Sequence, residues 1–349
     1  MDKPVAPPSR MTGRKPEGVT IRAVGERAGV SAMTVSNVIN GAGKVGATTR
    51  AAVLAAIEEM GYRPNIAARR LAKAKVTTLG LLYSDRGTPF IDSILLGALR
   101  ATNARGLQFI AQAEEALTRA AAEAAVRALV QGGASGVLLV PPFAELLSGS
   151  GLFAELGVAA AAIATGQPMA DISTVRIDNR AAMAAVTAHV AGQGHRRIGF
   201  LAGPESFSVA AERLVGFRDG LAASGIAYDP ALVVRCGFDP VSGAQAGRAL
   251  LTSSARPSAI LCSSDDMAAG LIGEAHRMGL RLPDDLAVTG FDDTAVAARL
   301  WPPLTVIRQP VGDMAFRAVE QVLASLRSRV VEDRVLDFEL VARESVGRG

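Results

Sequence analysis

The fold of the N-terminal part is decided by VTIRAVGERAGVSAMTVSNVINGAGKVGATTRAAVLAAIEEMGYRPN, residues 19–65. Thr20 can cap a first helix in which apolar residues recur at helical spacing, and Gly29 breaks that pattern. Ser31 is a suitable cap for a second, short helix, and a third helix is expected over about 47–60. The stretch therefore predicts three short helices, of which the first two are joined by a tight turn.

The second predicted helix has one apolar face and one open face. The apolar residues that recur at helical spacing and should point inward are Val35, Val38 and Ile39. The residues left on the open side are Ala32, Met33, Ser36 and Asn37. The residues of the third helix expected inside are Val53, Leu54 and Ile57. A tight helix-turn-helix whose second helix presents a polar face fits the major groove of DNA.

Charge is concentrated at the N-terminal end of the chain. Residues 1–75 contain 13 Lys/Arg and 5 Asp/Glu, a net charge of +8, whereas residues 76–349 contain 24 and 28, a net charge of −4. A small basic module on a mildly acidic body indicates a polyanion-binding part joined to a part with another task. The alternative, on charge alone, is a solvated basic tail.

A short basic segment joins the two parts. Pro64 ends the third helix, Asn65 can cap another, and 66–73 is compatible with a helix of only about two turns, which is unstable alone. Its basic residues suit phosphate neutralisation: Arg69, Arg70, Lys73 and Lys75. The expected order is a disordered tail over 1–18, a helix-turn-helix domain over 19–63 and a hinge over 64–75.

From residue 76 onward, short apolar segments alternate with alanine-rich helical ones. Such alternation predicts parallel, doubly wound sheets, and two of them form a clamshell with a ligand cleft at the carboxyl ends of the strands. We expect one α/β domain over 76–346, made of two interleaved subdomains with crossovers near 175–195 and 300–310. The expected strands are 78–84, 107–112, 136–141, 160–165, 197–203, 231–237, 259–264, 286–291, 304–309 and 335–346. The expected helices include 115–130, 180–192, 208–223, 265–278 and 311–328.

Composition excludes several classes of protein. With 349 residues, 49% of them hydrophobic and 20% charged, the chain is not disordered throughout, and no apolar run is long enough to cross a membrane. Prolines and charges occupy residues 1–20, where a secretory signal has an apolar region, so a cytoplasmic location is expected. Two cysteines and three histidines lack metal-site spacing, so we expect no metal and no cofactor. His195, which follows Gly194, is expected to have a structural role.

These segments resemble the lactose-repressor (LacI/GalR) family of transcriptional regulators. The motifs of the helix-turn-helix domain and the hinge that carry the resemblance are AGVSAMTVSNVING (28–41), TR (49–50), GYRPN (61–65) and ARRLA (68–72). The body motifs are GHRRIGFLAGP (194–204), SDDMAAG (264–270), LPDDLAVTGFDD (282–293) and LTVIRQP (304–310). They are similar to the family's effector-binding and dimerisation core, which itself resembles periplasmic sugar-binding proteins.

The resemblance implies particular DNA contacts. The residues that would read bases are Ala32, Met33 and Asn37, and those that would contact phosphates are Thr34, Ser36, Asn40, Thr49 and Asn65. The family usually has arginine at position 37, which suits guanine, whereas asparagine suits adenine, so an altered half-site is expected. Ala23 and Gly25 also depart from the family's Asp and Ala, and Gly25 is expected to cost the first helix up to about 1 kcal/mol.

The resemblance also implies a hinge that forms a helix only on DNA, paired with the hinge of a second subunit. Ala68, Arg69 and Leu71 would then lie in the minor groove, with Leu71 wedged into the central base step. The alternative for Leu71 is a linker residue packed on the body. The chain supplies no leucine-heptad tail after residue 349, so a homodimer on a pseudo-palindromic operator is expected.

The same resemblance implies an effector site, with a carbohydrate as the expected ligand. Its residues would be Arg213, Asp292, Ser264, Gln309 and Phe90. Ser264 replaces the family's asparagine and could instead only cap the following helix, and Asp292-Asp293 could be only a turn. Ala164-Thr165-Gly166 offers no carboxylate where many members have an aspartate, so fewer charged contacts are expected.

The expected function is that of a DNA-binding repressor under allosteric control by a sugar or sugar derivative. A corepressor-dependent regulator or an activator of the same family remains the alternative, and a sugar-binding receptor without a DNA role is the alternative outside that class. The chain lacks the phosphate-binding and catalytic motifs that an enzyme on a similar frame would need, so no enzymatic activity is expected. The identity of the effector, the operator sequence and the regulated genes stay open.

Overall fold

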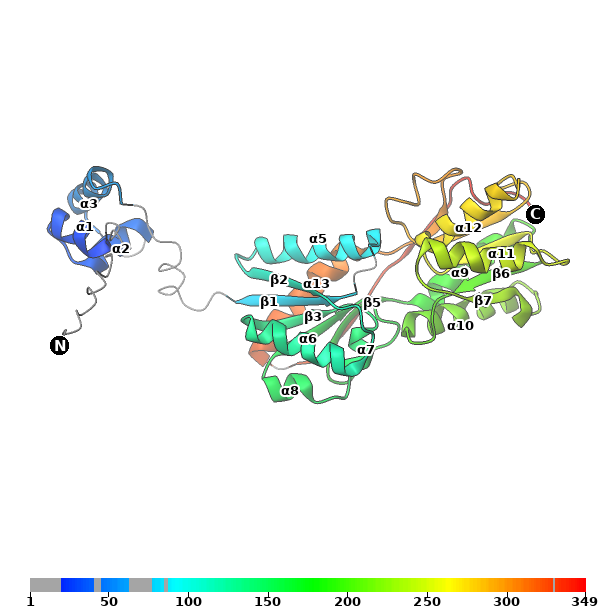
Figure 1. Ribbon diagram of the computed structural model, residues 1–349, viewed down its shortest axis with the longest axis horizontal. Helices are drawn as coiled ribbons and strands as arrows, with labels where there is room; N and C mark the ends of the chain where they lie inside the picture. The colour runs from blue at the N-terminus through cyan, green and yellow to red at the C-terminus, as the bar shows by residue number, and fades with distance from the viewer. Residues whose placement is uncertain (1–19, 41–44, 63–76, 85–86, 329) are drawn as a thin grey trace, which may run out of the picture. The chain divides into compact units, whose positions relative to one another are not determined.

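The computed structural model describes residues 20–40, 45–62, 77–84, 87–328 and 330–349. The chain divides into two compact units, Met1–Val76 and Thr77–Gly349. The first unit contains α1 (Ile21–Ala28), α2 (Ala32–Asn40) and α3 (Ala47–Glu59), which confirms the three predicted helices (Figure 1).

The caps of the first two helices are those the sequence predicts. The Thr20 hydroxyl accepts a hydrogen bond from the Ala23 N–H at 3.2 Å, and the Ser31 hydroxyl accepts one from the Thr34 N–H at 3.1 Å. Gly29 ends α1 in the left-handed region, with φ of 66°. These local bonds fix the tight turn between α1 and α2.

The core of the first unit is small and aliphatic. Its buried residues come from all three helices: Val24, Val35, Val38, Val53 and Ala56. The expectation for Leu54 is wrong, because its side chain is 52% exposed and Ala56 takes the inward position on α3. Val53 and Ala56 are three residues apart and share a face, whereas Leu54 lies about 100° further round the helix.

Gly25 serves the turn between the first two helices. A Cβ atom at this position would lie only 2.8 Å from the carbonyl oxygen of Val30. The loss of helix propensity at Gly25 is therefore offset by a close approach of the turn to α1, which a larger residue would obstruct.

The second unit consists of two α/β lobes. Lobe 1 contains a sheet with the strand order β11-β5-β4-β3-β1-β2, in which all pairs are parallel. Its strands are β1 (Thr78–Tyr83), β2 (Gln108–Ala113), β3 (Ala134–Leu139), β4 (Ala159–Ile163), β5 (Ser173–Ile177) and β11 (Asp333–Leu336). Its helices are α5 (Pro89–Asn103), α6 (Arg119–Gln131), α7 (Phe143–Leu147), α8 (Leu152–Leu156) and α13 (Val311–Ser328).

Lobe 2 has the strand order β12-β10-β9-β8-β6-β7, with one antiparallel pair between β10 and β12. Its strands are β6 (Ile198–Ala202), β7 (Val233–Arg235), β8 (Ala259–Cys262), β9 (Ala287–Asp292), β10 (Thr305–Arg308) and β12 (Glu339–Val341). Its helices are α9 (Asn179–Gly192), α10 (Ser208–Ala223), a 3-10 turn (Pro230–Leu232), α11 (Pro240–Leu251) and α12 (Asp265–Arg277). Helices cover both faces of each sheet, which confirms the predicted doubly wound, two-lobed architecture (Figure 1).

The chain passes between the lobes three times: after β5, after β10, and between β11 and β12. The third passage divides the single strand expected over 335–346 into two short strands in different sheets. Residues 337–338, between them, contain neither glycine nor proline, so the sequence gives no sign of the break. The strand β5 is also absent from the expectations.

Over the described part of the chain, no helix is long and apolar enough to cross a membrane. Within the same ranges, no group of three or more His, Cys, Asp or Glu side chains is placed to hold a metal ion.

Candidate functional site

A cleft lies between the two lobes of the second unit, at the carboxyl ends of their strands, with about 630 Å³ of empty space that is partly open to solvent. Its apolar lining from lobe 1 is Phe90, Ile91, Val140, Pro141 and Ala164, and that from lobe 2 is Phe207, Val209 and Phe238. Its polar lining is Ser84, Thr88, Arg213, Ser264, Asp266 and Asp292. A concave, mainly apolar site with a few convergent polar groups is typical of small-molecule binding.

Arg213, on α10, is the buried centre of the polar part. Its Nε donates to Asn179 Oδ1 at 2.9 Å, its Nη1 donates to the carbonyl of Ser263, and its Nη2 lies 3.9 Å from Asp292 Oδ1. The guanidinium carbon lies 3.7 Å from the centre of the Phe291 ring. Burial lowers the pKa of Arg213 to about 10, which leaves the side chain charged at neutral pH.

Asp292 ends β9 and faces Arg213 across the floor of the cleft. Its backbone has φ of 114°, an unusual value for a residue with a side chain. Gln309 Nε2 donates to Asp292 Oδ1 at 2.6 Å. Burial raises the pKa of Asp292 to about 7, against the opposing effects of Arg213 and of the bond from Gln309.

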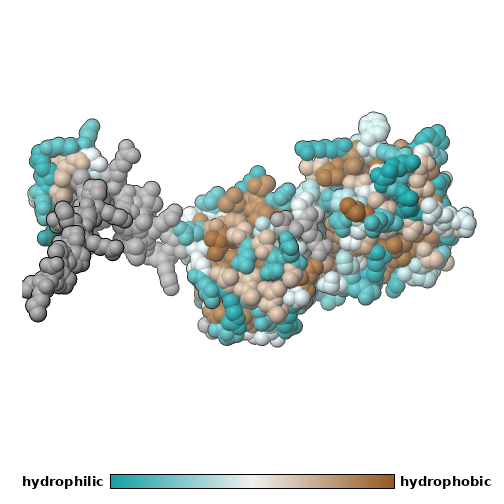
Figure 2. Space-filling model, viewed as in Figure 1, coloured by the Kyte–Doolittle hydropathy of each residue, from teal (hydrophilic) through white to brown (hydrophobic). Residues whose placement is uncertain are grey.

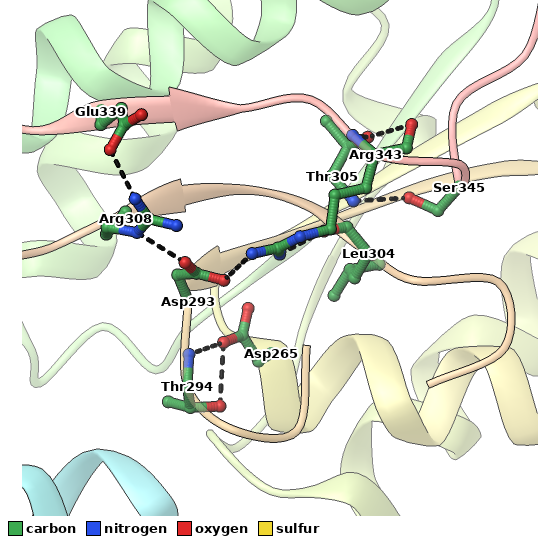
Figure 3. A network of polar contacts seen from close by, with 9 residues as sticks. All are labelled: Asp265, Asp293, Thr294, Leu304, Thr305, Arg308, Glu339, Arg343 and Ser345. Atoms are coloured by element: carbon green, nitrogen blue, oxygen red, sulfur yellow. Dashed lines mark hydrogen bonds and ion pairs between the residues drawn. The ribbon is translucent and has the colours of Figure 1, made fainter. Parts of the chain in front are cut away.

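A polar network around Asp293 and Thr294 holds the turn that follows Asp292, in which Asp292 and Asp293 both have positive φ (Figure 3). Asp265 Oδ2 accepts hydrogen bonds from the N–H and the hydroxyl of Thr294, at 2.7 and 3.0 Å. Asp293 forms ion pairs with Arg308 and Arg343, each at 2.7 Å. Because these contacts come from α12, β10 and the C-terminal segment, they over-determine the turn and fix the carboxylate that enters the cleft.

The high pKa of Asp292 predicts a pH dependence of stability. Between its ordinary pKa of 3.8 and its folded value of about 7, the folded protein keeps a proton that the unfolded chain has released. The resulting stabilisation is complete below the lower value and is lost as pH rises through about 7. Urea unfolding of wild type and Asp292→Asn across this interval should show wild type losing stability relative to the variant. Parallel pH profiles would contradict the assignment.

The structure brings four of the five expected effector residues to the cleft: Phe90, Arg213, Ser264 and Asp292. Gln309 lies behind Asp292 and orients it, and is not among the lining residues. Ser264 is placed for both of its expected roles. Its hydroxyl caps α12 by accepting a hydrogen bond from the Met267 N–H at 3.2 Å, and the residue also lines the cleft.

The cleft also contains residues that the sequence did not predict, among them Asp266, Phe207 and Phe238. Asp266 directly follows Asp265 in the first turn of α12, and this pair of acidic residues after a buried strand was the signal available. The two phenylalanines meet edge to face with ring centres 5.3 Å apart. No periodicity marks them, because they come from the start of α10 and the loop before α11.

Hydrogen bonds beside the cleft also join the two lobes, and we call this group of contacts the clasp. The Ser208 hydroxyl, on α10, accepts from the Gly166 N–H at 2.8 Å and donates to Glu145 Oε1 at 2.5 Å. Gln167 Nε2 donates to Glu212 Oε1 at 2.9 Å. Burial raises the pKa of Glu145. These contacts join α7 and the loop after β4, both in lobe 1, to α10 of lobe 2.

Removing the central hydroxyl of this clasp should loosen it. Ser208→Ala leaves the Gly166 N–H and the Glu145 carboxylate without their shared partner, so the Gly166 amide should exchange hydrogen about tenfold faster or more. Ser224→Ala removes a hydroxyl that donates only to the Gly220 carbonyl at the end of the same helix, and is the matched control. Equal exchange at Gly166 in the two variants would show that the clasp does not hold the lobes together.

His195 has the structural position expected for it. Its Nδ1 lies 2.9 Å from the Ser258 hydroxyl and its Nε2 lies 3.2 Å from the Gly347 carbonyl. The ring is buried, and burial lowers its pKa.

The outer face of α2 is the candidate DNA-reading surface. Met33 is 70% exposed, and Ala32 and Asn37 are partly exposed. Among the residues expected to contact phosphate, Thr34, Ser36 and Thr49 are also partly exposed. The Asn40 side chain and the hinge residues Asn65, Ala68, Arg69 and Leu71 lie outside the described residues.

A helix-turn-helix unit joined to a two-lobed ligand cleft defines an effector-regulated DNA-binding protein. Residues 20–65 match the family of bacterial regulatory proteins called the lacI family, and residues 187–346 match the periplasmic binding protein-like domain. The chain belongs to the LacI family of transcriptional regulators, and this family consists of DNA-binding regulators rather than enzymes.

Named relatives match along nearly their whole length. The transcriptional regulator CelR of Thermobifida fusca is 34% identical, over 93% of this chain and 98% of its own. GalR of Escherichia coli strain K12 is 31% identical, over 94% and 95%. The solved CelR–cellobiose complex has a TM-score of 0.70 at 32% identity and covers 94% of this chain and 99% of its own. The Lac repressor dimer bound to operator and the anti-inducer ONPF has a TM-score of 0.83 at 28% identity, with coverages of 95% and 100%.

Proposed function

We propose that this regulator is a repressor that binds a pseudo-palindromic operator as a homodimer and is released when a sugar or sugar derivative occupies the cleft. The observation that carries the proposal is the Arg213–Asp292 pair at the floor of a mainly apolar cleft. An arginine fork and a carboxylate side by side offer donors and acceptors for vicinal hydroxyls.

The other residues of the cleft suit the apolar faces of a sugar ring. Phe90, Phe207 and Phe238 present apolar surface to the C–H faces of a pyranose, while Ser84 and Thr88 add hydroxyls to the lining. Two relatives support the class of ligand, since CelR has been solved with cellobiose and the Lac repressor with ONPF.

Exposed apolar side chains support the homodimer. Leu96 and Leu99 lie on the outer side of α5, and Figure 2 shows apolar residues exposed in the region of this helix. On lobe 2, Val241 and Trp301 are also largely exposed. Large apolar side chains at the surface favour burial against a second chain, and a relative with the same architecture has been solved as a dimer.

For the DNA contacts, the proposal assigns base reading to Ala32, Met33 and Asn37 and phosphate contacts to Thr34, Ser36, Asn40, Thr49 and Asn65. Ala68, Arg69 and Leu71 would enter the minor groove from the hinge. A regulator of chromosomal operators acts in the cytoplasm, which we propose as its location. Effector binding would change how the lobes pack and pull the paired hinges apart, so that operator affinity falls.

Selection of bound sequences from a random DNA library by the purified full-length protein tests this function. We expect a palindrome with an easily kinked central step, and release of that DNA by a member of a sugar panel. Stronger binding with sugar would instead make the protein corepressor-dependent. Failure to enrich any sequence, with or without sugars, would contradict the proposed function.

A further inference from the structure

Asp266 is a charged residue of the cleft that takes no part in the Arg213–Asp292 ion pair. It lies in the first turn of α12, is only 9% exposed and lines the cleft. Its carboxylate forms no hydrogen bond or ion pair with any residue in the described ranges. Its neighbour Asp265, in contrast, is bound to Thr294 and lies outside the lining.

The cleft contains one cation for two carboxylates. Arg213 is the only basic residue among the described residues of the lining, and its donors are directed at Asn179, the Ser263 carbonyl and Asp292. Asp292 therefore has a partner of opposite charge, whereas Asp266 has none. Burial and the neighbouring Asp239 raise the pKa of Asp266, as expected for a carboxylate whose charge is not compensated.

A ligand that fills the cleft will complete the removal of Asp266 from water. A buried charge without a partner is strongly unfavourable, and a hydroxyl compensates it less than a group of opposite charge does. An anionic ligand, such as a uronic acid, would add a third negative charge to the two carboxylates. A ligand with a positive charge next to its hydroxyls would match both Asp266 and the Arg213–Asp292 pair.

We propose that the effector carries a protonated amine that pairs with Asp266, which makes it an amino sugar or a similar hydroxylated amine. The inference rests on the proposed function of the cleft and narrows its ligand class. In this arrangement the hydroxyls face Arg213 and Asp292, the ring lies against the phenylalanines, and the ammonium group is directed to the first turn of α12.

Isothermal titration of the full-length protein, without DNA, tests the proposal with matched probes. The amine probes are D-glucosamine, D-galactosamine and D-mannosamine. Each is compared with its neutral parent sugar and with its N-acetyl derivative, which keeps the nitrogen and removes the charge. We expect at least one amino sugar to bind about tenfold or more tightly than both of its matched compounds. Binding of no amino sugar, or equal binding within each set of three, would overturn the proposal.

Asp266→Asn links that preference to this residue. The variant keeps the shape of the side chain and should bind the amino sugar no better than its neutral parent. Asp284→Asn, which removes the same charge from an exposed site on lobe 2, is the control and should keep the preference. An unchanged preference in Asp266→Asn would overturn the assignment, and the wild-type titrations decide the ligand class even if the variant does not fold.

The outcomes separate this inference from the proposed function. A neutral sugar that binds and releases the selected DNA, with no amino sugar binding, would leave the proposed function standing and overturn the inference. An amino sugar that binds with the expected preference but leaves DNA binding unchanged would leave the inference standing and overturn the proposed function.

Discussion

Arg213→Met should abolish the response to effector and destabilise the Thr77–Gly349 unit by about 3–5 kcal/mol, the range found when one partner of a buried ion pair is removed. The loss leaves Asp292 buried without its cation and leaves Asn179 and the Ser263 carbonyl without their donor. Operator binding should persist, because Arg213 belongs to the second unit and not to the helix-turn-helix. The expected phenotype is a repressor that no sugar releases.

A double variant separates the loss of stability from the loss of effector binding. Arg213→Met combined with Asp292→Asn removes both charges, and replacing a buried pair by uncharged groups of similar volume is often nearly neutral for stability. We therefore expect urea unfolding to recover part of the lost free energy but not all of it, because Asn179 and the Ser263 carbonyl still lack their donor, while calorimetry still detects no sugar binding. Effector response in the stable double variant would show that the pair does not hold the ligand.

Asn37→Arg should change which operator the protein prefers. Asparagine pairs with the N6 and N7 edge of adenine, arginine pairs with the O6 and N7 edge of guanine, and each such pair is worth about 1–3 kcal/mol of discrimination. We expect the preferred base pair at one position of each half-site to change from A·T to G·C, by about 10- to 100-fold in relative affinity. Binding to a set of operators that differ at single base pairs measures this directly.

Thr49→Ala is the matched control for that change. As a proposed phosphate contact, Thr49 should affect all operators alike, so its removal should weaken binding without changing the order of preference. If Asn37→Arg also weakens all operators alike, residue 37 does not read a base.

The elements that sequence predicted well are those whose signals are local. Thr20, Ser31 and Gly29 mark the helix ends of the first unit through bonds within four residues, and the fully buried parallel strands are apolar runs. The strand β5 was missed because its pairing depends on distant residues. Its Arg176 forms an ion pair at 2.8 Å with Asp333 of β11, which lies much later in the chain.

The candidate site shows the same division. Arg213 and Asp292 could be named from family motifs, but the partners that define their chemistry cannot. Asn179 lies on another helix and Ser263 follows another strand, and only the folded chain brings both to the guanidinium. The acidic pair at the start of α12 was the available signal for Asp266, but its burial in the cleft without a partner in the described ranges appears only in the folded chain.

Ligand in the cleft and DNA on the helix-turn-helix units are expected to oppose each other's binding. The most direct test of this coupling is a pair of titrations of the full-length protein with the selected operator and the sugar that binds most tightly in calorimetry. Coupling between two sites is reciprocal, so operator should weaken sugar binding by the same factor by which sugar weakens operator binding, about 5- to 150-fold for typical allosteric proteins. Equal and substantial factors are the predicted result. Sugar that binds with the same affinity in the presence and absence of operator would contradict the account.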